Sequence, residues 1–561
     1  MKLVLCAVNS KYVHSSLAIW YLAASLEKYC ENDNLIHVLE GTINQEIDQL
    51  FNQILKIQPD IAAFSCYIWN IAYIKQLLRR LSPLLPHTVF ILGGPEVSYN
   101  PREVMEALPF LHYVLSGEGE LALPQLIDDI ADKQHCASLP GLTYRRGSEI
   151  ISNPIKPVSD DPPSPYTEQY FKALQGRIAY LETSRGCPFS CSFCLSGQGN
   201  SVRFFDLNRT KSDLNRLAHS GTRTIKLVDR TFNCDPNRAY ALFEYIIQMA
   251  PKWPQVRFHF EVAADLFDEM TLALLKTSPP GLIQMEAGLQ SFYAKTLTAI
   301  HRKTNIHRLI KNLKSLLDGG NIHIHVDLIA GLPHENLTYF EQSFNHAYAL
   351  APHMLQLGFL KMLHGTELRD NADSFQYSFS PEPPYELRSN RWLDPSQVSL
   401  LKGLEDHLER FYNSGRFRHT LDYLLAQTGL TPFVFYRSLA ESGHFGNLLH
   451  MSLDTYTEKV LQYFSQQPHI DPIKLRDCMA VDRLGSNSTG RLPKCLHIPD
   501  SRLKSIAAGL RKPNTKRGFA LLYSCETLQV AVSDYKQADP VTGLYPVKLI
   551  PVDSQGNPLS P

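Results

Sequence analysis

The chain has 561 residues, with 55 Lys plus Arg against 55 Asp plus Glu, and 44% of its residues are hydrophobic. This composition is typical of a globular protein with a buried core and room for about three domains. Nucleic-acid binders usually carry a basic excess, so the balanced charge argues against RNA or DNA as a ligand. The sequence lacks a bilayer-spanning apolar run and a secretory signal, which favours a cytoplasmic location.

Short apolar runs alternate with helical patterns over residues 1–140. The alternation predicts a parallel, doubly wound α/β sheet. The expected strands cover residues 2–8, 36–39, 60–67, 88–92 and 112–115. Ligands of such sheets bind beyond the carboxyl ends of the strands. We therefore expect a binding site where residues 9–10, 65–67, 93–96 and 117–120 follow these strands.

Residues 141–175 contain a stretch rich in Pro, Asp and Ser, which predicts a linker. The βα alternation returns over residues 176–380 and predicts a partial or full βα barrel with its chemistry at the carboxyl ends of the strands. The expected barrel strands cover residues 177–183, 224–228, 257–261, 282–287, 323–328 and 355–360.

Residues 381–561 have a different pattern and predict a mainly helical accessory domain of unknown function. Residues 397–412 and 420–430 are helical by periodicity, and a hairpin is expected near residues 517–532. Cys478, Cys495 and Cys525 are spaced too widely for a metal cluster, so we expect them to be buried thiols.

Three cysteines stand close together in the segment LETSRGCPFSCSFCLSG, residues 181–197. Cys187, Cys191 and Cys194 have the spacing C-x3-C-x2-C directly after an expected strand. Iron–sulfur clusters are held by Cys thiolates, and three local ligands leave one iron of a cubane open to a non-protein ligand. A structural zinc site would need four tight protein ligands. The other alternative is three incidental buried thiols, which this Gly- and Pro-flanked clustering disfavours.

The cysteine motif, with Phe193 just before the last Cys, resembles that of the radical S-adenosylmethionine superfamily. The resemblance implies a 4Fe–4S cluster on Cys187, Cys191 and Cys194. It also implies that S-adenosylmethionine binds the open iron and is cleaved to a 5′-deoxyadenosyl radical after reduction by a flavodoxin or ferredoxin. The protein then positions and shields this radical chemistry.

Other strand ends of the predicted barrel resemble the same superfamily. Residues 228–233 are similar to its Asp-Asp-Thr-Phe stretch, with Arg230 in place of the second Asp, and residues 286–291 to its E-x-G-x-Q-S segment. The resemblance implies that S-adenosylmethionine contacts Phe193, Asp229, Glu261, Glu286, Gly288, Gln290, Ser291 and Arg302. Arg302 would pair with the cofactor carboxylate; the alternative is a surface Arg on a helix. Glu261 is alternatively a strand-end carboxylate that faces water.

The first domain resembles the Rossmann-like cobalamin-binding domains that precede many radical S-adenosylmethionine barrels; the alternative is a generic nucleotide-binding or vestigial sheet. The implied cobalamin contacts are Asn9, Tyr12, His14, Ser15, Ser65, Tyr67, Trp69, Gly93, Gly94, Pro95, Glu96, Gly117, Glu118 and Glu120. The D-x-H-x-x-G motif that supplies an axial His in cobalamin mutases is absent. His14 is one candidate for that role, but we expect it to cap the following helix together with Ser15.

The whole arrangement resembles cobalamin-binding radical enzymes with a carboxy-terminal domain of unknown function. It implies an enzyme that transfers a methyl group from cobalamin to an unactivated carbon of a small molecule or peptide. Cobalamin-assisted cyclisation, rearrangement or oxidation is an alternative. A cobalamin- and iron–sulfur-binding sensor without turnover is another, although Glu286, Gln290 and Arg302 argue for a working cofactor pocket.

Overall fold

The computed structural model describes residues 1–133, 138–197, 201–446, 448, 451–510, 515–553, 555, 557 and 559. These residues form two compact units. The first comprises Met1–Val262, Ile300–Arg302 and Leu360–Arg388, and the second Ala263–Ala299, Lys303–Phe359 and Ser389–Pro561. No helix among the described residues is long and apolar enough to cross a membrane.

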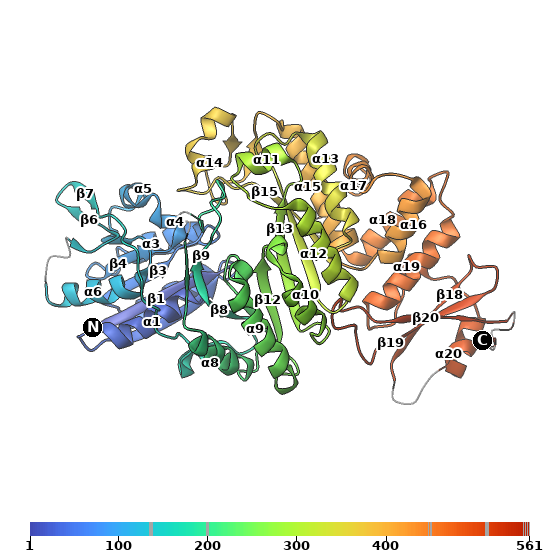
Figure 1. The fold of residues 1–561 in the computed structure, drawn as a ribbon, viewed down its shortest axis with the longest axis horizontal. Coiled ribbons are helices and arrows are strands. Elements are labelled where there is room, and N and C mark those ends of the chain that lie inside the picture. Colours follow the sequence, from blue (N-terminus) through green and yellow to red (C-terminus); the bar gives the residue numbers. More distant parts are fainter. Residues whose placement is uncertain are drawn as a thin grey trace. The chain divides into compact units, whose positions relative to one another are not determined.

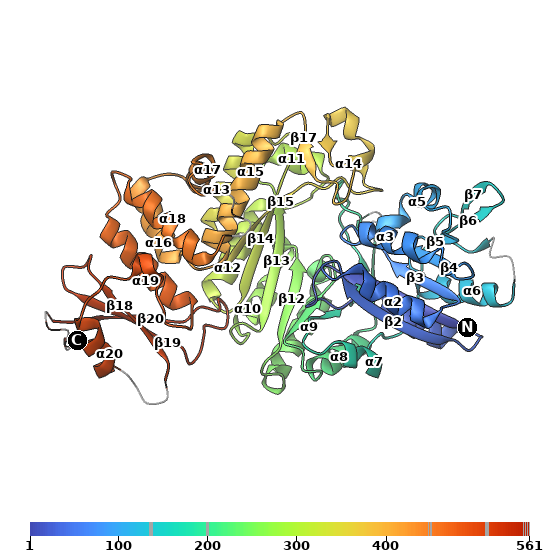
Figure 2. The same ribbon diagram turned by 180° about the vertical axis from the view of Figure 1, so that it is seen from behind.

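The first unit begins with the predicted doubly wound sheet, whose parallel strands have the order β2–β1–β3–β4–β5 (Figure 1). The strands are β1 (Lys2–Asn9), β2 (Leu35–Thr42), β3 (Ile61–Ser65), β4 (Val89–Gly93) and β5 (Tyr113–Leu115). One face is covered by α1 (Ala18–Tyr29) and α6 (Gly119–Ala131), and the other by α2 (Ile47–Ile57) and α3 (Ile71–Leu81), as Figures 1 and 2 show. Burial on both faces explains why these strands are continuous apolar runs.

The expected linker at residues 141–175 is wrong for its first part. β6 (Leu142–Arg146) and β7 (Glu149–Ser152) form a hairpin that pairs antiparallel with β5 and extends the first sheet. The hairpin covers what would otherwise be an exposed sheet edge. A further short helix, α7 (Glu168–Ala173), follows, and α4 (Pro95–Ser98) and α5 (Pro101–Ala107) lie between β4 and β5 in the chain.

The first unit also contains the first three predicted barrel strands. They are β8 (Ala179–Leu181), β11 (Thr224–Leu227) and β12 (Arg257–Val262), with β11 parallel to both others. β9 (Ser184–Gly186) and β10 (Val202–Phe204) pair antiparallel and enclose the cysteine segment. The helices are α8 (Leu207–Ala218), α9 (Pro236–Met249) and α14 (Glu367–Asp370), and the short strands β16 (Ser378–Phe379) and β17 (Leu387–Ser389) come later.

The other three predicted barrel strands lie in the second unit as β13 (Ile283–Gln290), β14 (His323–Ala330) and β15 (Met354–Phe359), all parallel. β13 and β14 alternate strictly between buried and partly exposed residues. The buried positions are apolar, whereas the other face carries Glu286, His325 and Asp327. The helices of this region are α10 (Glu269–Lys276), α11 (Ala294–Ala299), α12 (Ile306–Gly319) and α13 (Leu337–Ala349).

The carboxy-terminal part is mainly helical, as predicted. Its helices are α15 (Pro395–Leu408), α16 (Arg418–Thr428), α17 (Pro432–Glu441), α18 (Leu453–Ser465), α19 (Pro472–Ser486) and α20 (Arg502–Leu510). The predicted hairpin is β18 (Arg517–Leu522) with β19 (Gln529–Asp534), and β20 (Val547–Pro551) adds a third antiparallel strand. Cys478, Cys495 and Cys525 are half-buried rather than buried, which corrects the expectation.

Candidate active site

A cavity of about 770 Å³ lies at the carboxyl ends of the first sheet, where ligand sites of this fold are expected. Its floor is apolar, with residues of the sheet and of α1 and α6: Leu5, Ile19, Leu22, Ala63, Phe64, Ile91, Leu115 and Leu123. The predicted cobalamin residues that line it are Asn9, His14, Ser15, Ser65, Tyr67, Trp69, Gly93, Gly94, Pro95, Gly117, Glu118 and Glu120.

Glycine is required at one strand end for a steric reason. Gly94 has φ +104°, and a Cβ there would lie 2.6 Å from the carbonyl oxygen of Cys66 on the neighbouring strand end. The backbones that follow β3 and β4 therefore approach more closely than a side chain allows. This close approach shapes the wall of the cavity next to Pro95.

The loop after β3 is organised by Asn70, which sequence analysis missed. Asn70 is buried, and its Nδ2 donates to the carbonyl oxygens of Ser65 (2.9 Å) and Val8 (3.0 Å). Its Oδ1 accepts the backbone N–H of Tyr67 at 2.7 Å. The rings of Tyr67 and Trp69 stack with centroids 4.4 Å apart, so this loop gives the cavity an aromatic wall.

The expectation that His14 and Ser15 cap the following helix is wrong. α1 begins at Ala18, and its N-cap is Leu17, which makes no side-chain cap. His14 Nδ1 instead lies 2.6 Å from the hydroxyl of Tyr180, and Ser15 Oγ donates to the Ile178 carbonyl at 2.8 Å. Burial, followed by nearby cations, lowers the pKa of His14, which favours the neutral imidazole. The loop is therefore attached to the first barrel strand.

Two predicted cobalamin residues lie outside the cavity lining. Tyr12 is 72% exposed, and the Arg177 guanidinium lies over its ring at 5.7 Å. Glu96 is buried, and its Oε1 accepts a hydrogen bond from the Tyr385 hydroxyl at 2.5 Å. Neither side chain lines the cavity, and a contact of either one with cobalamin stays a prediction.

The barrel segment supplies a charged wall of the cavity that no sequence signal indicated. Tyr180, Glu182, Ser184, Arg185 and Arg230 line it. Arg185 donates to Glu118 at 2.5 Å and to Glu182 at 2.9 Å, and it also pairs with Glu120. Burial raises the pKa of Glu182, whereas Arg185 lowers it. One guanidinium thus joins the loop after β5 to the segment that leads into the cysteines.

The cavity fits the chemistry of cobalamin, which has an apolar base on its tail and a macrocycle fringed with amides. Apolar floor residues suit the tail, and the carboxylates and guanidiniums of the rim can exchange hydrogen bonds with amides. The residues that would hold the cofactor are those that line the cavity, from both the sheet and the first barrel strands.

The three motif cysteines lie in the same unit. Cys187 and Cys191 are buried and Cys194 is half-buried. Burial raises the pKa of the Cys191 thiol, Arg302 lowers it, and Cys194 and Cys187 raise it again, so the three thiols lie within electrostatic reach of one another. Arg302 Nη1 is 3.9 Å from the Cys191 sulfur, and its guanidinium lies over the Phe189 ring at 5.1 Å.

The spread of these sulfurs disfavours a single zinc ion. Ligands of one tetrahedral zinc lie about 3.8 Å apart, given Zn–S bonds of about 2.3 Å. Among the described residues, the only three potential metal ligands whose atoms all lie within 4.8 Å of one another are those of Glu286, His325 and Asp327. At least one pair of the cysteine sulfurs is therefore more than 4.8 Å apart. Their residue types and number suit a 4Fe–4S cluster with one open iron.

Two predicted residues near the cysteines have protein partners. Asp229 is buried and accepts hydrogen bonds from Thr183 Oγ1 (2.7 Å), Thr183 N (3.0 Å) and Ser184 Oγ (2.5 Å). It therefore anchors the segment before the cysteines, and any cofactor contact stays a prediction. Glu261 lies 3.7 Å from Arg230, the residue that departs from the family pattern. Phe193 is half-buried.

The E-x-G-x-Q-S segment lies in the second unit, at the end of β13. A bulge interrupts its pairing with β14 between Gly288 and Gln290, and Gln290 has φ +67°. Such a non-glycine conformation costs roughly 1–3 kcal/mol and is often found at functional sites. A Cβ on Gly288 would lie 2.2 Å from Gln290 Nε2, so the glycine makes room for this carboxamide.

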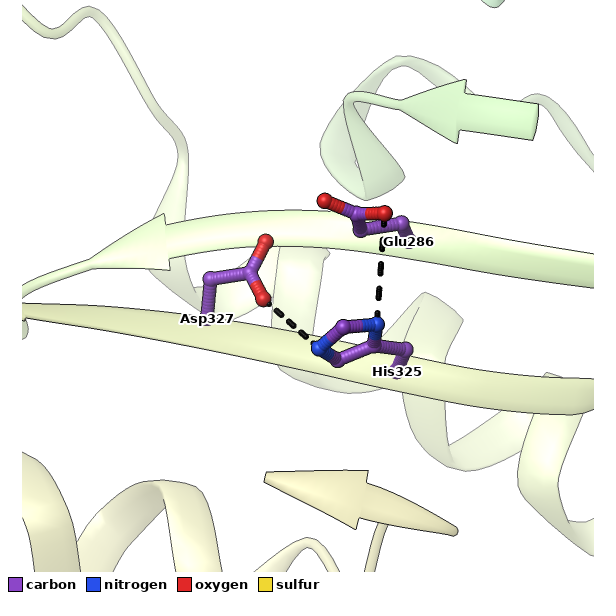
Figure 3. A group of neighbouring side chains, drawn as sticks. All are labelled: Glu286, His325 and Asp327. Carbon is purple, nitrogen blue, oxygen red and sulfur yellow. Dashed lines mark ion pairs between the residues drawn. The ribbon is translucent and has the colours of Figure 1, made fainter. Parts of the chain in front are cut away.

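Glu286, His325 and Asp327 point toward one another from β13 and β14 (Figure 3). His325 Nε2 lies 2.9 Å from Asp327 Oδ1, and Nδ1 lies 3.9 Å from Glu286 Oε2. The imidazole thus presents a different nitrogen to each carboxylate. His325 was missed because a single His within a strand pattern gives no functional signal.

Ser291 has a protein partner. It is fully buried, and its hydroxyl donates to Glu335 Oε1 at 2.5 Å, while its contact with S-adenosylmethionine stays a prediction. Glu286, Gly288 and Gln290 occupy the partly exposed face of β13, where a cofactor contact stays a prediction.

Family models match three segments of the chain. The B12 binding domain matches residues 3–127, the radical SAM superfamily residues 181–347, and a protein of unknown function, DUF4080, residues 373–520. These matches cover the first sheet, the predicted barrel and much of the carboxy-terminal part.

Parts of the chain are similar to known proteins. The chain is 29% identical over 307 residues to the cobalamin-dependent radical SAM methyltransferase TokK of Streptomyces tokunonensis, an alignment covering 51% of this chain and 44% of TokK. It is 23% identical over 417 residues to the anaerobic magnesium-protoporphyrin IX monomethyl ester cyclase of Cereibacter sphaeroides, covering 70% and 66%. The chain thus spans less than half the length of TokK.

A solved structure has a similar fold. The cobalamin-dependent S-adenosylmethionine radical enzyme OxsB, with aqua-cobalamin and S-adenosylmethionine bound, gives a TM-score of 0.58 at 16% identity. The match covers 85% of this chain and 78% of OxsB. At this identity the likeness is one of fold.

Proposed function

Because models of the B12 binding domain and of the radical SAM superfamily match this chain, we propose that it is a radical S-adenosylmethionine enzyme that transfers a methyl group to a carbon of its substrate. The single observation that carries the proposal is the presence, in one compact unit, of the Cys187–Cys191–Cys194 loop and the 770 Å³ cavity of the first sheet. A carbon that lacks an activating group needs both a radical source and a methyl donor.

When bound, the cluster with S-adenosylmethionine supplies a radical that removes hydrogen, and cobalamin supplies the methyl group. The protein's own residues bind and orient these groups. The three cysteines would hold the cluster, and Arg302, 3.9 Å from the Cys191 sulfur, would pair with the cofactor carboxylate. Apolar residues of the cavity floor would exclude water from the tail of the corrin.

A cobalamin-assisted cyclisation or oxidation is the second candidate. It is supported by the 23% identity to a magnesium-protoporphyrin cyclase, whose alignment covers 70% of this chain. Both outcomes need the same cofactors and differ only in whether the donor methyl reaches the product.

The proposal includes an external reductant, because cleavage of S-adenosylmethionine consumes an electron that the protein does not supply. A flavodoxin or ferredoxin is the proposed partner, and the substrate is a small molecule or peptide. The cysteine thiolates must stay reduced to bind iron, which supports a reducing, cytoplasmic compartment.

The decisive experiment uses the full chain, reconstituted anaerobically with iron, sulfide and cobalamin. We expect 5′-deoxyadenosine to form with a chemical reductant, and label from a deuterated methyl donor to appear in methylated product. Candidate substrates come from comparing metabolites of cells with and without the gene. Label-free product with deoxyadenosine would favour the cyclase-like outcome, and no deoxyadenosine from a fully loaded cluster would refute both.

A cysteine variant provides the matched comparison. Cys191→Ala removes one of three cluster ligands, so we expect the iron content and the broad absorbance of the cluster to be lost. Cys478→Ala changes a half-buried cysteine outside the motif and should keep the cluster. Equal iron content in the two variants would contradict the ligand assignment.

A further inference from the structure

The end of β13 combines an unusual backbone with a buried polar atom. Gln290 adopts φ +67°, in the left-handed region that non-glycine residues rarely occupy. Its Oε1 is buried and accepts no hydrogen bond within the part of the chain that the structure describes. Residues in such conformations persist only where the surrounding structure fixes them.

The groups that fix this segment converge on Glu335, which follows β14. Glu335 is 1% exposed, and its Oε1 accepts hydrogen bonds from Ser291 Oγ at 2.5 Å and from Ser343 Oγ at 2.8 Å. The hydroxyl of Ser343 belongs to α13, so the carboxyl group joins β13, the loop after β14 and a helix.

The two serine hydroxyls that bond Glu335 also accept hydrogen bonds from the backbone. Ser291 Oγ accepts the N–H of Tyr293 at 2.9 Å, and Ser343 Oγ accepts the N–H of Phe292 at 3.0 Å. Each hydroxyl has one proton, so donation to Glu335 orients its lone pairs toward these N–H groups. The carboxyl therefore sets the path of the three residues that follow Gln290.

We infer that Glu335 is a positioning residue: through Ser291 and Ser343 it holds the Gln290 carboxamide oxygen where a donor on the nucleoside part of S-adenosylmethionine can satisfy it. The ribose hydroxyls and the adenine amine are such donors. Glu335 itself is too buried to touch the cofactor. The inference rests on the proposed function.

Steric evidence from Gly288 supports the same placement. The Gln290 Nε2 lies 2.2 Å from the position of a Cβ on Gly288, so the carboxamide folds back over the glycine. Gly288 pairs with Asp327 on β14, and the bulge begins directly after it. The Gln290 side chain thus lies against strand β13 at Gly288, and the backbone that follows Gln290 is held by the hydrogen bonds of Glu335.

The test measures the dissociation constant of S-adenosylmethionine by calorimetry on the anaerobically reconstituted full chain. Glu335→Leu removes the acceptor of both hydroxyls, so we expect binding to weaken roughly tenfold or more. Glu335→Gln keeps an acceptor oxygen and should restore affinity to within about twofold of wild type. Cluster iron should be unchanged in both, because the cysteines lie in the other compact unit.

Glu269 offers a matched control, since its side chain is 92% exposed on α10. Glu269→Leu should leave binding unchanged. A purely structural role for Glu335 would lower the thermal midpoint without changing the dissociation constant, and equal affinity of Glu335→Leu and wild type overturns the inference. If Glu335→Leu does not fold, Ser343→Ala is measured instead. A dissociation constant of S-adenosylmethionine equal to that of wild type in Ser343→Ala also overturns the inference.

Failure of the proposed function gives a different result. A wild-type protein with a full complement of cluster iron that binds no S-adenosylmethionine refutes the function itself. A wild type that binds, next to a Glu335→Leu variant that binds equally well, refutes only the role of Glu335.

Discussion

The Gln290 side chain explains why residue 288 is a glycine. The Gln290 carboxamide occupies the space that a Cβ at position 288 would need, at 2.2 Å. The displaced atom is the end of a flexible side chain, so an added methyl group can be accommodated by moving that side chain. The cost then falls on the orientation of Gln290 rather than on folding.

We therefore predict that Gly288→Ala folds normally but binds S-adenosylmethionine several-fold more weakly. Calorimetric titration and thermal unfolding measure the two properties separately. Gly509→Ala, in a helix with open space around it, should leave binding unchanged. Unaltered affinity in Gly288→Ala would show that Gln290 does not contact the cofactor.

The raised pKa of Glu335 predicts that the stability of the folded protein depends on pH. Burial raises the pKa of this carboxyl from 4.5 to about 7, while the serine donors lower it less. A raised pKa means that the folded protein holds the proton more tightly, so this stabilising contribution is full below pH 4.5 and is lost as pH rises through about 7. The contribution is on the order of 3 kcal/mol.

The measurement is the difference in thermal midpoint between wild type and Glu335→Gln at a series of pH values. We expect wild type to lose stability relative to the variant between pH 4.5 and 8, because Gln does not ionise. A constant difference across that range would show that Glu335 titrates normally.

At the scale of elements, one side chain determines the loop after β3. Asn70 satisfies two carbonyls at the ends of β1 and β3 and one backbone N–H of the loop. Its removal would take the side-chain partner from the Ser65 carbonyl and the Tyr67 N–H, at a cost of about 1–3 kcal/mol for each group left unsatisfied. The stacked Tyr67 and Trp69 depend on this loop for their position on the cavity wall.

Asn70→Ala should accordingly lower both the thermal midpoint and the affinity for cobalamin, measured by absorbance titration. Asn44→Ala is the control, because the hydrogen bond that this side chain donates to the Ser10 carbonyl is exposed. Cobalamin affinity equal to wild type in Asn70→Ala would place the cofactor away from this loop.

For the whole molecule, the important connection is the one between the first sheet and the first barrel strands, within one compact unit. Arg185 shares its guanidinium among Glu118, Glu120 and Glu182, at the rim of the cavity. The four side chains are partly buried, so removal of the guanidinium would leave three carboxylates close together without a compensating charge.

Arg185→Met is thus predicted to lower the thermal midpoint by several degrees and to weaken cobalamin binding. Arg80→Met, which breaks an exposed pair with Asp48, should change stability by less than about 1 kcal/mol. Thermal unfolding and absorbance titration check both. If Arg185→Met and Arg80→Met had the same thermal midpoint, Arg185 and the three glutamates would not stabilise the fold through their ion pairs.

The expected strands of the first sheet and of the barrel are all present, because apolar runs with a regular period report burial directly. The strands that were not predicted include β6, β7 and β20, which have mixed composition and pair with a neighbouring strand of the same sheet. The hairpin of residues 142–152 was hidden for that reason inside an expected linker.

The sequence by itself determined the chemistry of the site: the spacing of Cys187, Cys191 and Cys194 and the polar strand ends are local patterns. Only the tertiary structure decided which side chains line the cavity: Arg185 and Glu182 do so, whereas Tyr12 is 72% exposed and Glu96 accepts a hydrogen bond from Tyr385. It also revealed Glu335, 44 residues from Ser291. Contacts of this kind join distant parts of the chain, and no periodicity within one element records them.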